Sequence, residues 1–394
     1  MGIFRANSPE PARPNRCRLV RRAILLVAGV VSGCLLAEAA SWCALCLAPA
    51  RRHIGRWEFR SGRPAPYQKA DYFNDEFLAE SMRCARLDEV TGAGFVVPGD
   101  FTGRYCNVVS GRRRTTDQPA ASSRRVLLFG GSTIFGQEVP DGWTVASCLQ
   151  RLLNQRSGPG WLVENYGTCS MIAGQQTERL RRVEVRTGDI VVFYDGVNDV
   201  FYPIYNGHIE GWHPGHGHDG GVRRLSALHR FLYPLCVAHR EHSATASLVL
   251  RCLEKQPPCN VADRATLESH LRAAEAGYQD ALVQAHNAVV HRGARFFHFL
   301  QPNLFTRHQW SRYETRLVRN ELRALPALDE AFALGYPALR NAARVAATSG
   351  VRSFDLSDVL DSRPARAEFY LDFCHVNHVA NERIAEAIVA RLGL

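Results

Sequence analysis

The chain reads Val126-Leu127-Leu128-Phe129-Gly130-Gly131-Ser132-Thr133 at the point that decides its fold. An apolar run without a polar face predicts a strand that is buried on both sides, as in a parallel sheet. Gly130 and Gly131 allow this strand to turn sharply into a loop because they carry no Cβ. The turn leaves the Ser132 hydroxyl exposed at the carboxyl end of the strand.

Similar apolar runs recur along the chain and alternate with segments of helical periodicity. Strands are predicted over 125–129, 162–166, 190–194, 295–300 and 353–356. Helices are predicted over 144–156, 176–184, 265–291, 338–347 and 377–392. This alternation predicts an α/β fold, a doubly wound three-layer α/β/α sandwich with a central parallel sheet. The active sites of such sheets lie beyond the carboxyl ends of the strands.

A second reactive stretch, Asp372-Phe373-Cys374-His375, lies just before the last predicted helix. With Ser132 it supplies a nucleophile, a carboxylate and a base in the order Ser…Asp…His. Serine is a weak nucleophile near neutral pH, so it needs an imidazole and a group that orients the imidazole. We therefore predict a triad of Ser132, His375 and Asp372. Two alternatives stay open: Ser132 could cap the following helix, and His378 could be the base if Asp372 is not the orienting group.

Two further strand ends carry polar motifs. Val163-Glu164-Asn165-Tyr166-Gly167 ends the second predicted strand, and Asp195-Gly196-Val197-Asn198-Asp199 ends the third. Over about 124–394 the chain thereby resembles the SGNH (GDSL-like) hydrolase superfamily, although the block I serine lies in Gly-Gly-Ser-Thr instead of the commoner Gly-Asp-Ser. The serine, glycine, asparagine and Asp-x-x-His of the family's four blocks match, in order, Ser132, Gly167, Asn198, and Asp372 with His375.

The resemblance implies an oxyanion hole made by the backbone N–H groups of Ser132 and Gly167 and the side-chain amide of Asn198. It also implies a fold of the flavodoxin-like, SGNH hydrolase type. We expect neither a cofactor nor a metal ion. Gly167 taken alone could be a plain turn glycine at a strand end. Asn198 and Asp199 could likewise form an Asx turn.

The composition argues against a nucleic-acid partner. The 394 residues carry a formal charge of +10, but Lys69 and Lys255 are the only lysines among 48 basic residues. Scattered arginines together with many alanines indicate a genome-wide bias rather than a binding surface for nucleic acid. Attraction to anionic lipid or acidic polysaccharide stays open.

The segment 23–49 is apolar apart from Ser32, Glu38 and Ser41, and arginines flank it on both sides. Its length predicts a membrane-spanning signal anchor; a cleaved signal peptide and a buried helix of a soluble protein are the alternatives. Six arginines precede it, which favours a cytoplasmic tail over 1–22 and a catalytic domain in the periplasm or outside the cell. Glu38 is costly in hydrocarbon, so we expect it near the interface or paired with a neighbour.

The remaining regions are a linker and N-terminal extension over 50–123 and an insertion over 201–264 in the hydrolase domain, 124–394. A strand or hairpin is predicted over 103–111. The insertion contains His208, His213, His216 and His218 among glycines, but their spacing fixes no common face, so a lid is favoured over a metal site. Of twelve cysteines, the pairs Cys84 with Cys106 and Cys252 with Cys259 could form bridges, although connectivity cannot be deduced from sequence.

The sequence thus predicts a membrane-anchored serine esterase that hydrolyses O-acyl esters, above all acetyl esters. The run Phe299-Leu300-Gln301-Pro302-Asn303 resembles a motif of membrane-anchored bacterial members, which implies a carbohydrate of the cell envelope as substrate and places Gln301 near the rim of the site. An O-acyltransferase with the same triad, working with envelope-polysaccharide machinery, is the first alternative. A glycan-binding protein without catalysis is the second.

Overall fold

The structure is a computed structural model that describes residues 16–47, 52–54, 57–59, 64–85, 87–89, 96–122, 124–157, 160–205, 243–245, 263–361 and 367–394. The four histidines of the insertion, Cys252 and Cys259 lie outside the described residues. By its internal contacts the chain divides into two units. One comprises Met1–Pro49 and Ser226–Lys255, and the other comprises Ala50–Leu225 and Gln256–Leu394. The predicted domain boundaries stay predictions.

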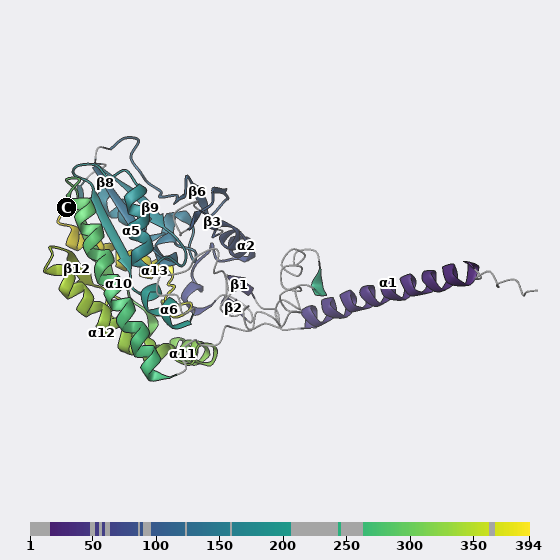
Figure 1. Ribbon diagram of the computed structural model, residues 1–394. Coiled ribbons are helices and arrows are strands. Elements are labelled where there is room, and N and C mark those ends of the chain that lie inside the picture. Colours follow the sequence, from purple (N-terminus) through teal and green to yellow (C-terminus); the bar gives the residue numbers. More distant parts are fainter. Residues whose placement is uncertain are drawn as a thin grey trace, which may run out of the picture. The chain divides into compact units, whose positions relative to one another are not determined.

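The larger unit is built on one sheet in which five neighbouring strands are parallel (Figure 1). These strands are β8 (Arg124–Gly130), β9 (Trp161–Gly167), β10 (Ile190–Asp195), β11 (Arg295–Leu300) and β12 (Arg352–Asp355). Their spatial order is β9-β8-β10-β11-β12. In chain order this is 2-1-3-4-5, the order of flavodoxin-like folds. The predicted α/β fold is confirmed, and each predicted strand is found within a residue or two of its bounds.

The sheet differs from the prediction at its β9 edge. Three short strands from the N-terminal extension, β5 (Phe101–Thr102), β6 (Asn107–Val109) and β7 (Arg112–Arg113), continue it in antiparallel sense, so the whole sheet has eight strands and is mixed. An open strand edge exposes unpaired N–H and C=O groups, and β7 covers part of that edge by pairing with β9. The predicted hairpin over 103–111 lies in this addition. Two hairpins, β1 (Arg52–Ile54) with β2 (Trp57–Phe59) and β3 (Leu87–Glu89) with β4 (Val96–Pro98), are separate from the sheet.

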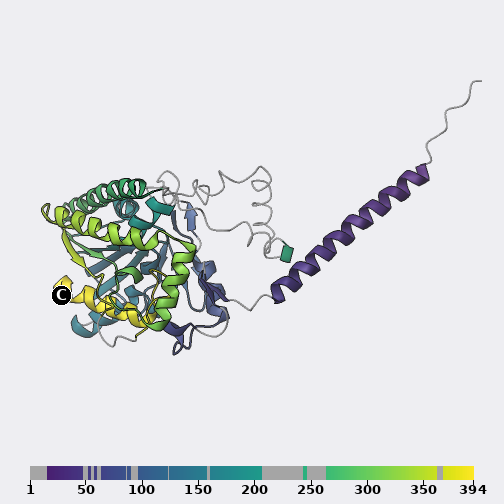
Figure 2. The same ribbon diagram turned by 90° about the horizontal axis from the view of Figure 1, so that it is seen from below.

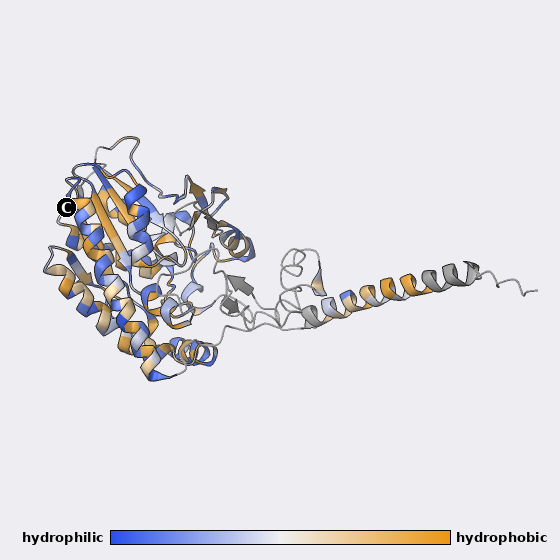
Figure 3. Ribbon diagram, in the orientation of Figure 1, coloured by the Kyte–Doolittle hydropathy of each residue, from blue (hydrophilic) through white to orange (hydrophobic). Residues whose placement is uncertain are grey.

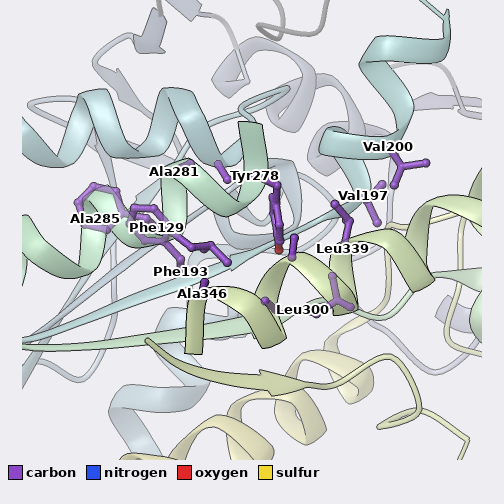
Figure 4. Packing of buried hydrophobic residues seen from close by; sticks show 14 of the residues in the cluster. Phe129, Phe193, Val197, Val200, Tyr278, Ala281, Ala285, Leu300, Leu339 and Ala346 are labelled. Atoms are coloured by element: carbon purple, nitrogen blue, oxygen red, sulfur yellow. The ribbon is translucent and has the colours of Figure 1, made fainter. Parts of the chain in front are cut away.

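Helices cover both faces of the parallel strands, because apolar side chains project from both faces of these strands. Along β8, Leu127 and Phe129 belong to one buried cluster while Val126 and Leu128 belong to another, as the two-residue period of a strand requires. The first cluster (Figure 4) contains residues of α5 (Ala173–Arg182), α6 (Val197–Tyr205), α10 (Arg264–Val290) and α12 (Leu328–Ala347). The second contains residues of α4 (Val145–Ser157), α11 (Arg312–Ala324) and α13 (His378–Leu392). In Figure 2 the yellow α13 accordingly lies across the strands from the green α10.

Several helices depart from the prediction, and among them α6 and α11 were not predicted. Helix α12 begins at Leu328 rather than at 338, and Pro337 lies inside it. Proline interrupts a helix by removing one hydrogen bond, but the turns before it bury Phe332 and Tyr336, and this packing holds the helix together. Helix α2 (Asp75–Cys84) of the extension was not predicted. It packs in a third cluster that includes Phe73, Phe77, Phe135 and Leu371.

The smaller unit contains α1 (Arg16–Leu47), which the sequence predicts as the anchor. Its segment Leu25–Cys43 has a mean hydropathy of 1.7 and few buried side chains, and Figure 3 shows it mostly in orange. By length and composition α1 could cross a membrane or serve as a signal sequence. Glu38 has partners, as expected: its carboxylate accepts from the Ser243 hydroxyl (2.9 Å) and from the N–H groups of Ala244 and Thr245.

Candidate active site

The predicted site residues follow the carboxyl ends of three neighbouring strands. Gly130, the last residue of β8, pairs with Gly167 of β9 on one side and with Tyr194 of β10 on the other, so the three strands end at one level. The chain order of the strands reverses between β8 and β10. This switch point is where open α/β sheets bind their ligands. Ser132 follows the first of these two strands, and Asn198 follows the second.

Ser132 begins α3 (Ser132–Phe135), a single helical turn, and Gly131 occupies the capping position. The Ser132 hydroxyl makes no capping bond but lies 2.7 Å from His375 Nε2. The alternative that Ser132 caps the helix is therefore wrong. The glycines are required sterically, because a Cβ at Gly130 would lie 2.6 Å from the Tyr194 carbonyl oxygen and one at Gly131 would lie 2.7 Å from Asn198 Nδ2.

His375 links Ser132 to a buried carboxylate. His375 Nδ1 lies 2.8 Å from Asp372 Oδ2, and the other oxygen of Asp372 accepts the N–H groups of Cys374 and His375, each at 2.8 Å. Asp372 is fully buried and His375 is 7% exposed. Because an ionised carboxylate only accepts, the imidazole donates from Nδ1, and Nε2 of the neutral ring accepts from Ser132. A hydroxyl so placed can be deprotonated as it attacks an electrophile.

His378, the rival base, is the first residue of α13 and makes other contacts. Its Nδ1 lies 3.1 Å from the Tyr72 hydroxyl, and its ring packs edge-on against Trp143 with ring centroids 5.1 Å apart. Burial lowers the pKa of His378. The structure therefore places His375, and not His378, against the Ser132 hydroxyl.

Asn198 and Asp199 lie in the first turn of α6, and not in the Asx turn that the sequence also allowed. Asn198 Nδ2 donates to the Met171 carbonyl oxygen at 2.9 Å, and Asp199 Oδ1 accepts the Ala173 N–H at 2.9 Å. Burial, together with the neighbouring charge of Asp195, raises the pKa of Asp199 well above its usual value. Together the two side chains hold the segment before α5 beside Ser132.

Gly167 lies close to the nucleophile turn, but its N–H has another partner. A Cβ at Gly167 would lie 2.2 Å from the Phe135 nitrogen, so the position needs glycine for packing. The Gly167 N–H donates to Asn165 Oδ1 at 2.9 Å instead of pointing to Ser132. The nearby Ser170 has a positive φ of 68°, which is uncommon for a residue other than glycine, and its sequence carries no sign of this.

A buried polar network beneath the site was missed by the sequence analysis. Asp195 Oδ1 accepts the Tyr278 hydroxyl at 2.5 Å and lies 3.2 Å from His298 Nε2, while His298 Nδ1 lies 2.6 Å from the Ser353 hydroxyl. The network joins β10, α10, β11 and β12 just before the turn that carries Asn198. One signal was present: His298 is the single polar residue inside the apolar run Phe296–Leu300.

Two further features have structural partners. Gln301 is 4% exposed; its N–H donates to the Asp195 carbonyl oxygen and its own carbonyl accepts from Tyr336. Asp372, Cys374 and His375 have donor atoms within 4.8 Å of one another, a spacing that a metal ion could use. A metal ion there would displace the hydrogen bonds that join the carboxylate and the imidazole to each other, so the geometry favours a hydrogen-bonded triad.

No protein-family model and no curated protein matches this chain. Among the solved structures similar to it is a member of the lipolytic protein G-D-S-L family from Veillonella parvula DSM 2008, with 10% identity, 69% of this chain and 99% of that chain covered, and a TM-score of 0.37. Phospholipase A1 from Streptomyces albidoflavus NA297 has 9% identity, coverage of 68% and 98%, and a TM-score of 0.37.

A third is Est24, a carbohydrate acetylesterase from Sinorhizobium meliloti, with 11% identity, coverage of 69% and 99%, and a TM-score of 0.34.

Proposed function

We propose that the chain is a serine esterase in which Ser132 is the nucleophile, His375 the general base and Asp372 the group that orients and stabilises the imidazole. The observation that carries this proposal is the unbroken contact from Ser132 Oγ to His375 Nε2 (2.7 Å) and from His375 Nδ1 to Asp372 Oδ2 (2.8 Å). Ser132 and His375 are 243 positions apart in the sequence, yet their side chains meet at the switch point of the sheet. A residue that served only to cap a helix would not need such contacts.

In the proposed reaction the Ser132 oxygen attacks the ester carbonyl carbon while its proton passes to His375 Nε2. The carbonyl oxygen becomes an oxyanion, and the leaving alcohol takes the proton from His375 as the ester bond breaks. Water then cleaves the acyl-enzyme through the same base. Asp372 stabilises the imidazolium, and this interaction is strong because Asp372 is excluded from water.

The oxyanion requires donors close to Ser132. The Ser132 N–H at the start of α3 and the Asn198 amide beside Gly131 fit this role. Asn198 uses one of its two amide hydrogens on the Met171 carbonyl oxygen, which leaves the second for substrate. Gly167 was expected to be a third donor, but its N–H is bonded to Asn165. We propose the first two donors as the hole.

For the substrate we propose O-acyl esters, above all acetyl esters, of carbohydrate in the cell envelope. Support comes from the resemblance of Phe299–Asn303 to the motif of membrane-anchored members and from α1, whose length and hydropathy suit an anchor. We further propose that α1 holds the protein in the membrane by a single pass, with the larger unit in the periplasm or outside the cell.

The test uses the full-length chain, isolated from membranes in detergent. Wild type should hydrolyse p-nitrophenyl acetate, and Ser132→Ala should reduce kcat by a factor on the order of 10³ or more. O-acetylated and deacetylated oligosaccharides are then supplied in parallel, and released acetate and acetylated acceptor are both measured. Release of acetate supports the esterase. Faster transfer to the sugar hydroxyl than to water supports the transferase, and binding without turnover supports a glycan-binding protein.

A further inference from the structure

Two cysteines of the N-terminal extension lie side by side inside the protein. Cys84 is the last residue of α2, and Cys106 immediately precedes β6. Both are fully buried in the third cluster, which combines residues of the extension with Phe135 and Leu371 of the hydrolase domain. Both thiols are free in this structure, and each is the largest cause of the shift in the pKa of the other, as expected of neighbouring groups.

Glu80 explains why these two cysteines meet. Its carboxylate accepts the consecutive N–H groups of Arg104 (3.0 Å), Tyr105 (2.7 Å) and Cys106 (2.6 Å). Cys84 follows Glu80 by one helical turn and therefore lies on the same face of α2. The carboxylate that binds the 104–106 backbone thus brings Cys106 to Cys84.

The contact with Glu80 is built into the local sequence. A Cβ at Gly103 would lie 2.2 Å from Glu80 Oε1, so only glycine leaves room for the carboxylate. The Asn74 side chain caps α2 by accepting the Phe77 N–H at 2.8 Å, which fixes where the helix begins. The juxtaposition of the two thiols is therefore a consequence of several independent contacts, and not of one side-chain rotamer.

We propose that Cys84 and Cys106 form a disulfide bond in the mature protein. The two thiols lose two protons and two electrons, and the electrons reduce the disulfide of an oxidising thiol–disulfide carrier to a dithiol. The thiolate of one cysteine attacks the carrier disulfide, and the other thiol then resolves the mixed disulfide. Because both are buried, the bond forms while the cluster is still closing.

The bond would support the proposed site without taking part in it. The same cluster contains Phe135, the last residue of the turn that begins at Ser132, and Leu371, which precedes Asp372. Closing the loop between Cys84 and Cys106 restricts the unfolded chain. The proposal rests on the proposed position of this unit outside the cytoplasm, where disulfides persist, and is independent of the esterase activity.

The experiment maps the thiols of the full-length chain isolated from membranes. Free thiols are blocked with N-ethylmaleimide under denaturing conditions without reductant, and the digest is analysed by mass spectrometry. A peptide pair joined through Cys84 and Cys106 is expected. N-ethylmaleimide on both cysteines, or a link from either of them to another cysteine such as Cys169, would overturn the proposal. This readout uses wild type and does not depend on any variant folding or on turnover.

A thermal measurement provides the matched control. Dithiothreitol should lower the Tm of wild type by about 5–10 °C, since the closed loop lies in a cluster that joins several elements. Cys148→Ser removes a buried thiol in α4 that contacts Arg151 rather than sulfur, and it should keep the full shift. Cys84→Ser combined with Cys106→Ser should show no shift. An equal response of the double variant and wild type would contradict the assignment.

Discussion

At the scale of single residues, the candidate site depends on hydrogen bonds that fix direction. Asp372 accepts three of them, two from backbone N–H groups and one from His375, so the imidazole has one orientation, toward Ser132. The N–H of Leu371 donates to the His375 carbonyl oxygen at 2.8 Å and folds the loop back on itself. The loop is thus rigid before any substrate arrives, which reduces the reorganisation that the reaction requires.

Replacing His375 and His378 by glutamine, one at a time, shows which of them is the base. His375→Gln should lower kcat for p-nitrophenyl acetate by a factor on the order of 10³ or more, because the amide cannot take the Ser132 proton. His378→Gln keeps Ser132, His375 and Asp372 intact and should leave kcat within a few-fold of wild type. The measurement is kcat for both variants, with circular dichroism as a check on folding. Loss of activity in His378→Gln alone would reassign the base.

The triad residues could be predicted from sequence because each stands in a short local motif. Gly167 was predicted as a donor on the same grounds, yet its N–H is bonded to the side chain of Asn165, two residues away. A sequence motif shows which residue is present, but it does not show which acceptor the backbone N–H of that residue binds. Tyr278, His298 and Ser353 were missed for a related reason. They come from three separate elements and meet only in the folded sheet.

At the scale of elements, the turn that follows Ser132 carries a buried carboxyl group that the mechanism does not use. Glu138 is fully buried, and no other residue of the described chain hydrogen-bonds to either of its carboxyl oxygens. Burial raises the pKa of Glu138 well above its usual 4.5, and the nearby Asp372 adds to this. The folded protein therefore keeps the Glu138 proton at pH values where the unfolded chain has lost it.

The sign of the resulting pH dependence follows from proton binding. Above about pH 4.5 the folded state binds more protons at Glu138 than the unfolded state, so its contribution to the free energy of unfolding falls as the pH rises. Glu138→Gln has no ionisable group at this position, so its stability does not fall with pH in this way. The urea midpoint of this variant should therefore exceed that of wild type by an increasing margin between pH 5 and pH 8. Glu386→Gln, at an exposed position of α13, is the control. A margin that is constant with pH would show that Glu138 is ionised in the folded state.

The elements themselves were largely predictable from hydrophobic periodicity. The strands β8, β10 and β11 are apolar at most positions, and the long helices between them show a buried stripe. The start of α12 could not be predicted, because Pro337 is a helix-breaking signal that packing overrides. Helix α2 could not be predicted either, because its apolar residues are buried through contact with distant parts of the third cluster.

At the scale of the whole molecule, the topology explains why one edge of the sheet carries the chemistry. The strand order reverses between β8 and β10, and the turns that leave these strands begin with Ser132 and Asn198. The extension adds strands at the β9 edge, and its own cluster includes Phe135 and Leu371, which are close in sequence to the triad residues. The alternation of parallel strands and helices followed from the sequence pattern, but the addition at the β9 edge did not, because strands of two or three residues leave almost no periodic signal.

A fluorophosphonate probe reacts covalently with activated serine nucleophiles, so it reports on the proposed role of Ser132 without the need for a known substrate. The probe is added to the full-length wild type and to Ser132→Ala, and the adduct is located by peptide mass spectrometry. The account predicts one adduct, on Ser132 of wild type, with none on the folded Ser132→Ala protein. An adduct on a different serine, or equal labelling of the two proteins, would contradict it.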